Sequence, residues 1–338
     1  MAVITVIGAG VMGSAMSIPA RENGHEVRLV GTMLDREIIE YGKKTGEHLT
    51  LKRTLPEGTV FCQLEELDEA LIGTDLIIGG VSSFGVEWFK DKIIPKLPSK
   101  TPVLSITKGM MDMSDGSMKT YPELYEEAAP GRVFCAVGGP CTSYELADRD
   151  QTAICFCGRD EKILRWMKSL LECSFYHISI STDVLGVECA VAIKNAYALG
   201  VSLAVGLSEK RDGTLHYNSQ AALFGQSVKE MRKLLALFGG HDDNIIYGAG
   251  DLYVTIFGGR TRMIGTLLGK GVPFDEAMAQ LSGVTLESIV IATRTGQAVL
   301  KMIDIGKAKA DDFPLLLHID DIINKNIPVD IPWDKFTF

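Results

Sequence analysis

The sequence has no surplus of positive charge. Its 338 residues include 34 Lys and Arg against 43 Asp and Glu, which gives a formal net charge of −9. Proteins that bind nucleic acid or an anionic membrane surface normally present a basic patch and a basic overall balance. We therefore expect neither nucleic acid nor a membrane as a partner. Anionic small molecules remain compatible with this charge, because local positive groups bind them rather than the overall balance.

Cysteine is sparse and shows no pattern of a disulfide framework or a metal site. The seven cysteines are an odd number, and none is clustered with histidine as a zinc site requires. Cys155 and Cys157 lie on one face of an expected strand, again without a histidine beside them. We predict reduced, mostly buried thiols in a cytoplasmic protein, and no bound metal.

The sequence also lacks an uninterrupted apolar run that could cross a membrane. Its most membrane-like stretch, 187–207, contains Glu188, Lys194 and Asn195, so we interpret it as a buried helix. The N-terminal stretch Met1–Val6 is apolar and has no basic leader, so we expect a strand there rather than a signal peptide.

The length suits two domains, and the pattern changes near Thr182. Up to that residue, short β-rich runs alternate with helical stretches such as Val11–Asn23, Phe84–Leu97 and Glu161–Cys173. Near-continuous apolar strands that alternate with helices are typical of a parallel sheet covered on both faces. The expected strands are Ala2–Gly8, Glu26–Gly31, Thr59–Cys62, Asp75–Val81, Pro102–Thr107, Arg132–Gly138, Thr152–Cys157 and Phe175–Ile180.

After Asp183 the strand pattern stops and helical periodicity dominates. We therefore predict an α/β protein with a dinucleotide-binding, Rossmann-like domain over 1–182 and an all-helical substrate and catalytic domain over 183–338. The expected helices are Val184–Leu207, Asn218–Phe238, Arg260–Leu268, Phe274–Leu281, Leu286–Ile303 and Phe313–Asn324.

A glycine-rich turn joins the first strand to the first helix. The pattern G-x-G-x-x-G is strong evidence for dinucleotide binding when it stands between a strand and a helix at the start of an α/β domain. Gly8 would permit the tight turn, Gly10 would let a pyrophosphate approach the backbone, and Gly13 would let the helix pack on the strand. Val11 and Met12 open the helix, whose N-terminal N–H groups would face the phosphates. The alternative is an ordinary glycine-rich turn.

The end of the second strand favours NADP over NAD. An acidic residue there would bind the 2′-hydroxyl of NAD and repel the 2′-phosphate of NADP, but the position is Gly31. Thr32 is a candidate phosphate contact, and Arg36 and Lys52 are candidate cations. Asp35 lies close by in the sequence, which keeps NAD open as the alternative.

Several unusual residues follow predicted strands. Ser82 follows Asp75–Val81, Lys108 follows Pro102–Thr107, and Gly139 and Cys141 follow the strand that ends at Gly138. In an open parallel sheet these positions share an edge with the glycine-rich turn, where ligands bind. Lys108 is therefore either a substrate contact or a solvated side chain.

Lys194 stands within an apolar stripe of the long helix. An unpaired buried ammonium is unfavourable, so such a lysine is paired, borders a cavity, or reaches solvent at an interdomain seam. Next to a cavity it would suit general acid–base catalysis on a carbonyl/alcohol pair, and Asn195 could orient a hydroxyl or an amide. The stripe consists of Val187, Val191, Lys194, Ala198, Val201 and Val205.

Two later segments combine glycine with charge. We interpret 248–252 as a glycine-rich turn that presents Asp251. The segment 258–262 places Arg260 and Arg262 at the start of a helix, where guanidinium groups and free N–H groups both suit phosphate binding. Either segment alone is also typical of a solvated surface turn.

Taken together, these segments resemble the NAD(P)-dependent glycerol-3-phosphate dehydrogenase family of bacterial and archaeal type over nearly the whole chain. The resemblance implies a Rossmann domain and an all-helical domain with the active site in the cleft between them, in a cytoplasmic homodimer. The matching residues are Gly8-Ala9-Gly10-Val11-Met12-Gly13, Thr107-Lys108-Gly109, Gly138-Gly139-Pro140, Gly186-Val187-Glu188, Lys194-Asn195, Gly250-Asp251-Leu252, Thr255 and Gly259-Arg260.

The resemblance also implies roles for individual residues. Lys194 would be the proton donor and acceptor, and Lys108 would contact substrate and cofactor. Asp251 would bind the polar end of the substrate and tune Lys194. Arg260 would hold the substrate phosphate near the cofactor, and Glu287 would lie at the nicotinamide end. The remaining implied contacts are Val11, Met12, Thr32 and Ser143 for the cofactor, and Gly139, Cys141, Asn195, Thr255 and Thr261 for the substrate.

The chain departs from the family pattern around the substrate. The family usually has Gly-Pro-Ser, Ser-Arg-Asn and Glu-Gly where this chain has Gly139-Pro140-Cys141, Gly259-Arg260-Thr261 and Glu287-Ser288. These changes alter hydrogen-bonding groups but leave Lys194 and Asp251 in place. We expect hydride transfer between NADPH or NADH and dihydroxyacetone phosphate. The alternatives are a dehydrogenase for a longer polyol phosphate or related hydroxy compound, and a non-catalytic nicotinamide-binding sensor.

Overall fold

The computed structural model describes residues 1–112, 118–284 and 286–336, and the chain divides into two compact units. The first unit comprises Met1–Gly109 and Lys119–Glu188. The second begins at Cys189 and also includes the short strand β8 (Met110–Asp112). Helix α9 (Val184–Asp212) therefore starts in the first unit and continues into the second. The boundary that we predicted between residues 182 and 183 lies just before this helix.

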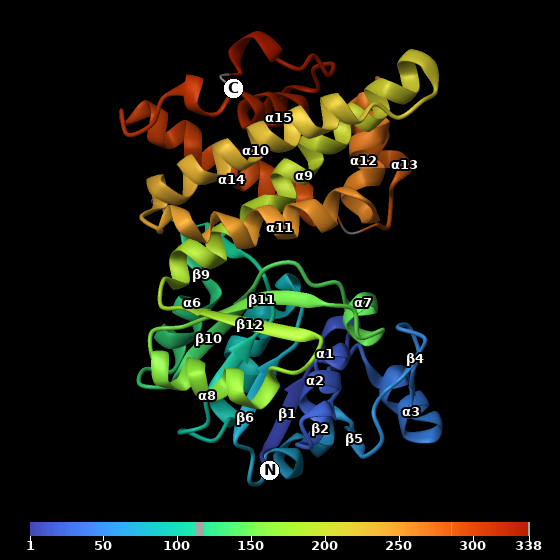
Figure 1. The fold of residues 1–338 in the computed structure, drawn as a ribbon, viewed down its shortest axis with the longest axis vertical. Coiled ribbons are helices and arrows are strands. Elements are labelled where there is room, and N and C mark those ends of the chain that lie inside the picture. The colour runs from blue at the N-terminus through green and yellow to red at the C-terminus, as the bar shows by residue number, and fades with distance from the viewer. Residues whose placement is uncertain (113–117, 285, 337–338) are drawn as a thin grey trace. The chain divides into compact units, whose positions relative to one another are not determined.

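An eight-stranded sheet forms the centre of the first unit, in the order β12-β11-β10-β7-β6-β1-β2-β5 (Figure 1). Each strand lies within or close to a run predicted from the sequence, so the Rossmann-like sheet is confirmed. Neighbouring strands are parallel with one exception, the antiparallel pair β10 and β11. The segment between them holds only the short helix α7 (Ser143–Ala147), and the chain turns back beside β10 instead of crossing a face of the sheet. The strands are β1 (Val3–Ile7), β2 (Glu26–Val30), β5 (Thr59–Cys62), β6 (Leu76–Gly79), β7 (Val103–Ser105), β10 (Phe134–Gly138), β11 (Thr152–Cys157) and β12 (Tyr176–Ser181).

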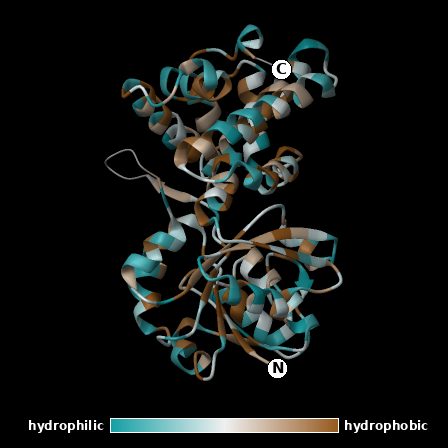
Figure 2. Ribbon diagram, turned by 60° about the vertical axis from the view of Figure 1, so that its left-hand side comes forward, coloured by the Kyte–Doolittle hydropathy of each residue, from teal (hydrophilic) through white to brown (hydrophobic). Residues whose placement is uncertain are grey.

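Successive side chains along a strand point to opposite faces of the sheet, and in the middle of this sheet both sets of side chains are buried. Val6 belongs to one core cluster and its neighbour Ile7 to the other, and Leu29 and Val30 divide in the same way. The strands of the sheet are therefore coloured mostly for hydrophobic residues in Figure 2. Residues of α1, α2 and α8 join the first cluster, and residues of α4, α5 and α6 join the second.

Three helical stretches were predicted in the first unit, and all three are helical: Val11–Asn23 is divided into α1 and α2, and Glu161–Cys173 contains α8, whereas α3, α4, α6 and α7 were not predicted. The segment predicted as a helix over Phe84–Leu97 is helical but irregular: α5 (Val86–Trp88) continues as a π-turn to Ile93 and as a 3-10 turn to Lys96. Pro95 has no N–H group, so regular α-helical hydrogen bonding cannot continue past it. The other helices are α1 (Val11–Ala15), α2 (Ser17–Glu22), α3 (Arg36–Thr45), α4 (Leu67–Ala70), α6 (Tyr121–Ala128), α7 (Ser143–Ala147) and α8 (Glu161–Leu171). There are also two separate two-stranded sheets. One pairs β3 (Glu47–His48) with β4 (Arg53–Thr54), and the other pairs β8 (Met110–Asp112) with β9 (Met118–Thr120).

In the second unit, the described residues from 189 to 336 form helices and loops but no strand, which confirms the expected all-helical domain. Gly239 ends α10 in the left-handed conformation, with φ at 91°. One helix, α11, was not predicted. The helices after α9 are α10 (Tyr217–Phe238), α11 (Ile245–Ile256), α12 (Gly259–Gly269), α13 (Phe274–Gln280), α14 (Glu287–Asp304) and α15 (Pro314–Lys325).

Helix α9 is apolar and long enough to cross a membrane by length and composition, yet 83% of its most apolar window is buried inside the protein. The prediction of a buried helix is therefore confirmed. The stripe that surrounds Lys194 is fully packed, with Val187, Val191 and Ala198 all at 0% exposure. All seven cysteines lie in the described part of the chain, and most of them are buried.

Candidate active site

The glycine-rich turn after β1 has the geometry that a dinucleotide requires. Gly8 has φ at 114°, and a Cβ at Gly13 would lie 2.0 Å from the Gly8 carbonyl oxygen. Gly10 is different: its φ of −64° suits any residue, and a Cβ there would meet no described atom within 4 Å. The fold therefore requires Gly8 and Gly13, whereas the missing side chain of Gly10 leaves open the space that cofactor phosphates would fill.

Long-range hydrogen bonds fix this turn. The Ala9 amide donates to the Asp35 carboxylate at 3.1 Å, and the Ala9 carbonyl contacts His48 Nε2 at 2.8 Å. His48 Nδ1 accepts from the Leu51 amide at 2.9 Å, so the proton of the ring is on Nε2, which donates to Ala9. His48 is fully buried. Sequence reasoning missed His48, because no local pattern connects it with a turn some 40 residues earlier.

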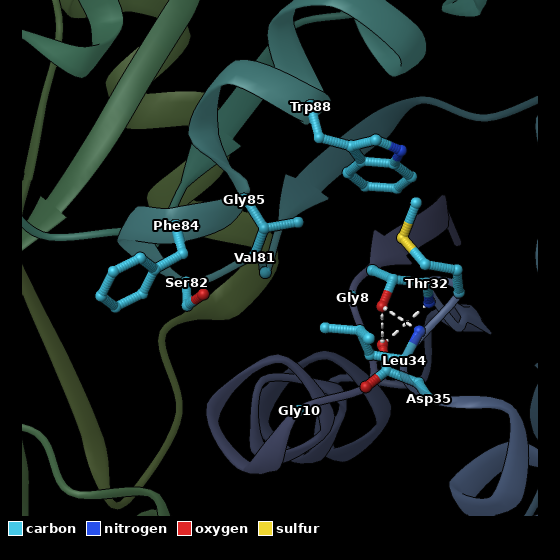
Figure 3. A pocket seen from close by; sticks show the side chains of 12 residues that line it. Gly8, Gly10, Thr32, Leu34, Asp35, Val81, Ser82, Phe84, Gly85 and Trp88 are labelled. Carbon is cyan, nitrogen blue, oxygen red and sulfur yellow. Dashed lines mark hydrogen bonds between the residues drawn. The ribbon is translucent and has the colours of Figure 1, made fainter. Parts of the chain in front are cut away.

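A pocket of about 340 Å³ lies in front of the turn (Figure 3). Its size falls within the range of small-molecule and cofactor sites. Figure 3 shows Thr32 and Asp35 near the glycine turn, with Phe84 and Trp88 on the segment that follows β6. The pocket is lined by Gly8, Gly10, Thr32, Met33, Leu34, Asp35, Gly80, Val81, Ser82, Phe84, Gly85 and Trp88.

The carboxylate near the end of β2 is turned inward. Asp35 Oδ2 accepts from the Thr32 amide and the Thr32 hydroxyl, both at 2.8 Å, in addition to the Ala9 amide. A Cβ at Gly31 would lie 3.2 Å from the Asp35 Cβ and 2.7 Å from Ile39 Cγ1, so no acidic side chain fits there without rearrangement. Thr32, the candidate phosphate contact, lines the pocket, and its hydroxyl donates to Asp35.

The candidate cations stand outside this pocket. Arg36 forms an exposed ion pair with Glu65, with the two side chains 58% and 65% exposed. Neither Arg36 nor Lys52 is among the described residues that line the pocket.

Predicted site residues meet at the carboxyl edge of the sheet. Lys108 Nζ donates to the Gly139 carbonyl oxygen at 2.7 Å, which joins the segments after β7 and β10. Gly139 has φ at 111°, and Thr107 donates through its hydroxyl to the Val81 carbonyl at 2.6 Å. Cys141 packs against the core of the first unit, and Ser143 is buried at the start of α7.

In the second unit, Lys194 forms an ion pair with a buried carboxylate. Its Nζ donates to Asp251 Oδ1 at 2.6 Å and to the Thr255 hydroxyl at 3.1 Å. The side chains of Lys194 and Asp251 are only 12% and 2% exposed. Thr255 Oγ1 also donates to the Asp251 carbonyl, one turn earlier on the same helix, at 2.6 Å. The three groups therefore form a compact, partly shielded cluster in which an ammonium is held in a fixed position.

The prediction that Asp251 lies in a glycine-rich turn is wrong, because the residue lies within α11. Gly248 allows two helices to pack closely and does not form a turn. A Cβ at Gly248 would lie 2.5 Å from the Ala190 carbonyl oxygen of α9, so only glycine lets the two helices approach this closely. That approach places Asp251 of α11 against Lys194 of α9.

Three other predicted residues of this unit, Arg260, Thr261 and Glu287, lie in the first turn of a helix. Arg260 is exposed in the first turn of α12, where Gly259 has φ at 77°, and Thr261 is 9% exposed beside it. Glu287 is the first residue of α14, and Asn195 is half-buried next to Lys194. Arg262, the second arginine of the segment 258–262, donates to the Ile256 carbonyl at 2.8 Å.

Comparison with known proteins decides the family. The model of the NAD-dependent glycerol-3-phosphate dehydrogenase N-terminus matches residues 3–164, and that of the C-terminus matches residues 183–333. The chain belongs to the NAD-dependent glycerol-3-phosphate dehydrogenase family. It is thus an NAD(P)-dependent oxidoreductase that acts on a CH–OH group.

Individual relatives agree with this family. The NADP(+)-dependent glycerol-3-phosphate dehydrogenase of Archaeoglobus fulgidus is 33% identical over 82% of this chain and 83% of its own. The glycerol-3-phosphate dehydrogenase [NAD(P)+] of Koribacter versatilis is 30% identical over 86% of this chain and 85% of its own. The crystal structure of the Coxiella burnetii glycerol-3-phosphate dehydrogenase has the same fold, with a TM-score of 0.79 at 22% identity over 99% of this chain and 97% of that one.

Two glycine variants test where the cofactor of this family member binds. Gly10→Ala should keep the melting temperature within a few degrees, because its backbone suits alanine and no described atom lies within 4 Å of the new Cβ. It should weaken NADPH binding about tenfold or more, since the methyl group would occupy the approach of the phosphates. Gly13→Ala should lower both affinity and melting temperature, because its Cβ would lie 2.0 Å from a carbonyl oxygen.

Cofactor fluorescence titration and thermal melting measure both quantities. Unchanged NADPH affinity in a folded Gly10→Ala protein would place the phosphates elsewhere.

Proposed function

We propose that this chain interconverts dihydroxyacetone phosphate and sn-glycerol 3-phosphate, and that Lys194 exchanges the proton. The observation that supports this most directly is the 2.6 Å bond from the Lys194 ammonium to the buried Asp251 carboxylate. The relatives from Archaeoglobus fulgidus and Koribacter versatilis are named for activity on glycerol 3-phosphate, which supports the same substrate here.

In this proposal, Lys194 acts on the carbonyl oxygen of the ketone. Its ammonium donates a hydrogen bond to that oxygen, stabilises the negative charge that develops there, and then transfers a proton to the alkoxide. In the reverse direction the neutral amine removes the proton from the alcohol. Asp251 stabilises the ammonium between turnovers, and Thr255 fixes its direction by accepting a second N–H at 3.1 Å.

The nicotinamide cofactor supplies the hydride in this family. The open space at Gly10 suits its pyrophosphate, and the amides of Val11 and Met12 at the start of the helix would bind the phosphate oxygens. Lys108, held by the Gly139 carbonyl, is proposed to contact substrate and cofactor at the same sheet edge.

Arg260 is the proposed partner of the substrate phosphate. It lies in the first turn of α12, where a planar guanidinium and free N–H groups both favour an anion. Binding energy at the phosphate would orient the carbonyl at the other end of a short substrate. Asn195, Thr261 and Glu287 are proposed to complete the binding of substrate and nicotinamide.

The decisive experiment measures turnover with different ketones and with one variant of Lys194. The purified protein should oxidise NADPH with dihydroxyacetone phosphate, and Lys194→Met should lower kcat about 100-fold or more while cofactor affinity stays nearly unchanged. Lys270→Met is the matched control: this lysine is paired with Glu209 at 2.6 Å but is 45% exposed, so its loss should not change kcat.

Faster turnover with longer ketose phosphates would favour a polyol phosphate as the substrate. Cofactor binding without reduction of either class of ketone would favour a sensor, and wild-type turnover in Lys194→Met would end the proton-transfer role.

We also propose that NADP is preferred over NAD. Asp35 is 9% exposed and its Oδ2 already accepts three hydrogen bonds, so it is poorly placed to bind a ribose 2′-hydroxyl. The exposed pair of Arg36 with Glu65 contributes little free energy, so Arg36 can exchange Glu65 for a 2′-phosphate at low cost. The NADP(+) dependence in the name of the Archaeoglobus fulgidus relative agrees with this preference.

Cofactor kinetics test the preference. Arg36→Ala should raise the KM for NADPH about tenfold and leave the KM for NADH unchanged, because a charge-assisted bond to phosphate is worth about 1.5–3 kcal/mol. Arg165→Ala removes a similar exposed pair, with Glu161 on α8, and should change neither value. Equal changes for both cofactors in Arg36→Ala would show that this residue does not recognise the 2′-phosphate.

We further propose a cytoplasmic homodimer. The support is an exposed apolar face on α11, where Ile246, Tyr253 and Phe257 are 64%, 55% and 60% exposed. Tyr253 and Phe257 contact each other edge to face, with centroids 4.8 Å apart, so the face is preorganised. Such a face is typical of an interaction surface. Sedimentation of the purified protein should give twice the mass of one chain, and a monomer at micromolar concentration would contradict the proposal.

A further inference from the structure

His48 is a fully buried histidine whose ring contacts two separate segments of the backbone. It is 0% exposed and is not among the described residues that line the pocket. Its Nε2 contacts the Ala9 carbonyl oxygen at 2.8 Å, while its Nδ1 accepts from the amides of Leu51 at 2.9 Å and Thr50 at 3.2 Å. A ring in this position does not reach a bound cofactor, so it influences cofactor binding only through the backbone of the glycine turn.

The two ring nitrogens have opposite hydrogen-bonding roles. Because two amides donate to Nδ1, this nitrogen carries no proton, and the single ring proton lies on Nε2 and is donated to Ala9. An imidazolium would place a second ring N–H against the two amides. The hydrogen bonds therefore hold His48 as a neutral donor, which excludes it as a cation for the cofactor phosphates.

The segment that carries His48 is itself fixed at several points. Leu51 and Leu55 belong to the core cluster of the first unit that also contains residues of α1, and they are 0% and 3% exposed. Arg53, which lies between them, binds both carboxylate oxygens of Asp148, at 2.5 and 2.9 Å. The ring of His48 therefore approaches Ala9 from a rigid support and has little freedom to turn away.

The bond to Ala9 sets the direction of the next amide in the turn. A peptide unit is planar and trans, so the Ala9 carbonyl and the Gly10 N–H point to opposite sides of one rigid plane. The carbonyl oxygen is held by His48 at 2.8 Å and by the Ser14 hydroxyl at 3.2 Å. The Gly10 N–H is thereby directed away from His48. Gly10 also lines the pocket, and the space beside its Cα is open.

We propose that His48 is a positioning residue for the cofactor, which presents the Gly10 N–H to a cofactor phosphate by holding the Ala9 carbonyl. This inference rests on the proposed binding of the phosphates at the glycine turn. The same bond keeps the Ala9 carbonyl oxygen, which would repel a phosphate, turned away. A donor that is oriented before the ligand arrives need not be ordered on binding, which favours affinity. Without His48, the Ser14 hydroxyl alone holds this peptide unit.

The alternative is that His48 only stabilises the fold. Two substitutions separate these roles, because each keeps one of the two sets of hydrogen bonds. In His48→Asn the side-chain oxygen takes the place of Nδ1 and accepts from Leu51, but the shorter side chain no longer reaches Ala9. In His48→Gln the side-chain amide reaches the position of Nε2 and donates to Ala9, but the acceptor for Leu51 is lost.

The first test measures NADPH affinity by cofactor fluorescence titration, at a temperature below the melting point of every variant. His48→Asn should weaken NADPH binding about three- to tenfold, which is the loss expected when one hydrogen bond no longer orients the turn. His48→Gln should bind NADPH within about twofold of the unmodified protein, although its melting temperature falls.

His25→Asn is the matched control. His25 is also buried, at 8% exposure, and its Nδ1 also accepts from a backbone amide, that of Ala2 at 3.2 Å, but it precedes β2 at the amino end of the sheet. Its substitution should leave NADPH affinity unchanged. Unchanged affinity in folded His48→Asn overturns the proposal. Equal losses in His48→Asn and His48→Gln also overturn it, because binding would then depend on the segment 47–55 and not on the bond to Ala9.

The second test uses nuclear magnetic resonance on ligand-free protein, so it needs neither cofactor nor turnover. In the unmodified protein at neutral pH, the nitrogen shifts of the His48 ring should show the neutral tautomer with its proton on Nε2. Amide nitrogen relaxation should show Gly10 as rigid on the ps–ns timescale, and more mobile in His48→Asn while the amides of β1 stay unchanged. A ring proton on Nδ1, or equal mobility of Gly10 in both proteins, overturns the proposal.

These outcomes are distinct from failure of the proposed function. The NADPH titration needs no substrate, so a protein that does not reduce dihydroxyacetone phosphate still tests the role of His48. Unchanged NADPH affinity in Gly10→Ala would contradict the proposed phosphate site and this inference with it. A loss of affinity in Gly10→Ala but not in His48→Asn would contradict this inference alone.

Discussion

The close approach of α11 to α9 at Gly248 is the constraint on which the proposed catalytic pair depends. A Cβ at this position would lie 2.5 Å from the Ala190 carbonyl oxygen, so the helices meet backbone to backbone. About one turn farther along each helix, Lys194 and Asp251 face each other at 2.6 Å. A hydrogen bond of this length tolerates little displacement, and misplacing a reacting group by about 1 Å can cost about 100-fold in rate. The electrostatics of the lysine therefore depend on a backbone contact that involves no charge.

The first unit uses the same principle around its glycine turn. Gly8 and Gly13 bring the first strand and helix together, while Asp35 and His48 bind the Ala9 backbone from two other segments. A carboxylate near the end of β2 would normally be expected to bind the ribose of the cofactor. Asp35 instead stabilises the glycine turn from inside the protein. In the proposed preference for NADP, the choice of cofactor therefore rests on exposed groups such as Arg36 and not on Asp35.

The sequence was most informative where side-chain periodicity determines structure. All strands of the central sheet were located, because each is a short β-rich run bounded by turn residues and those in the middle of the sheet are apolar on both faces, and the stripe around Lys194 identified a buried helix. The direction of β11 was missed, since a strand buried on both faces looks the same in either orientation. Asp251 was predicted as a site residue and placed in a turn, whereas it lies in a helix, because Gly248 suggests a turn locally and its packing partner is known only from the three-dimensional structure. The contact of His48 with the glycine turn joins distant segments, which no local pattern records.

The acidic balance of the chain, −9, is at odds with a family that binds an anionic cofactor and an anionic substrate. The two observations are compatible because surface charges and the groups of a shielded site act over different distances. Surface charges are screened over about 8–10 Å in physiological salt, whereas groups in a shielded site act over one hydrogen bond at low dielectric. The groups proposed to contact the ligands are positive or neutral: the backbone of the glycine turn, Lys108, Lys194 and Arg260. The carboxylate paired with Lys194, Asp251, is itself 1% exposed. In the proposed function it stabilises the Lys194 ammonium from inside the protein and presents little surface to the ligand.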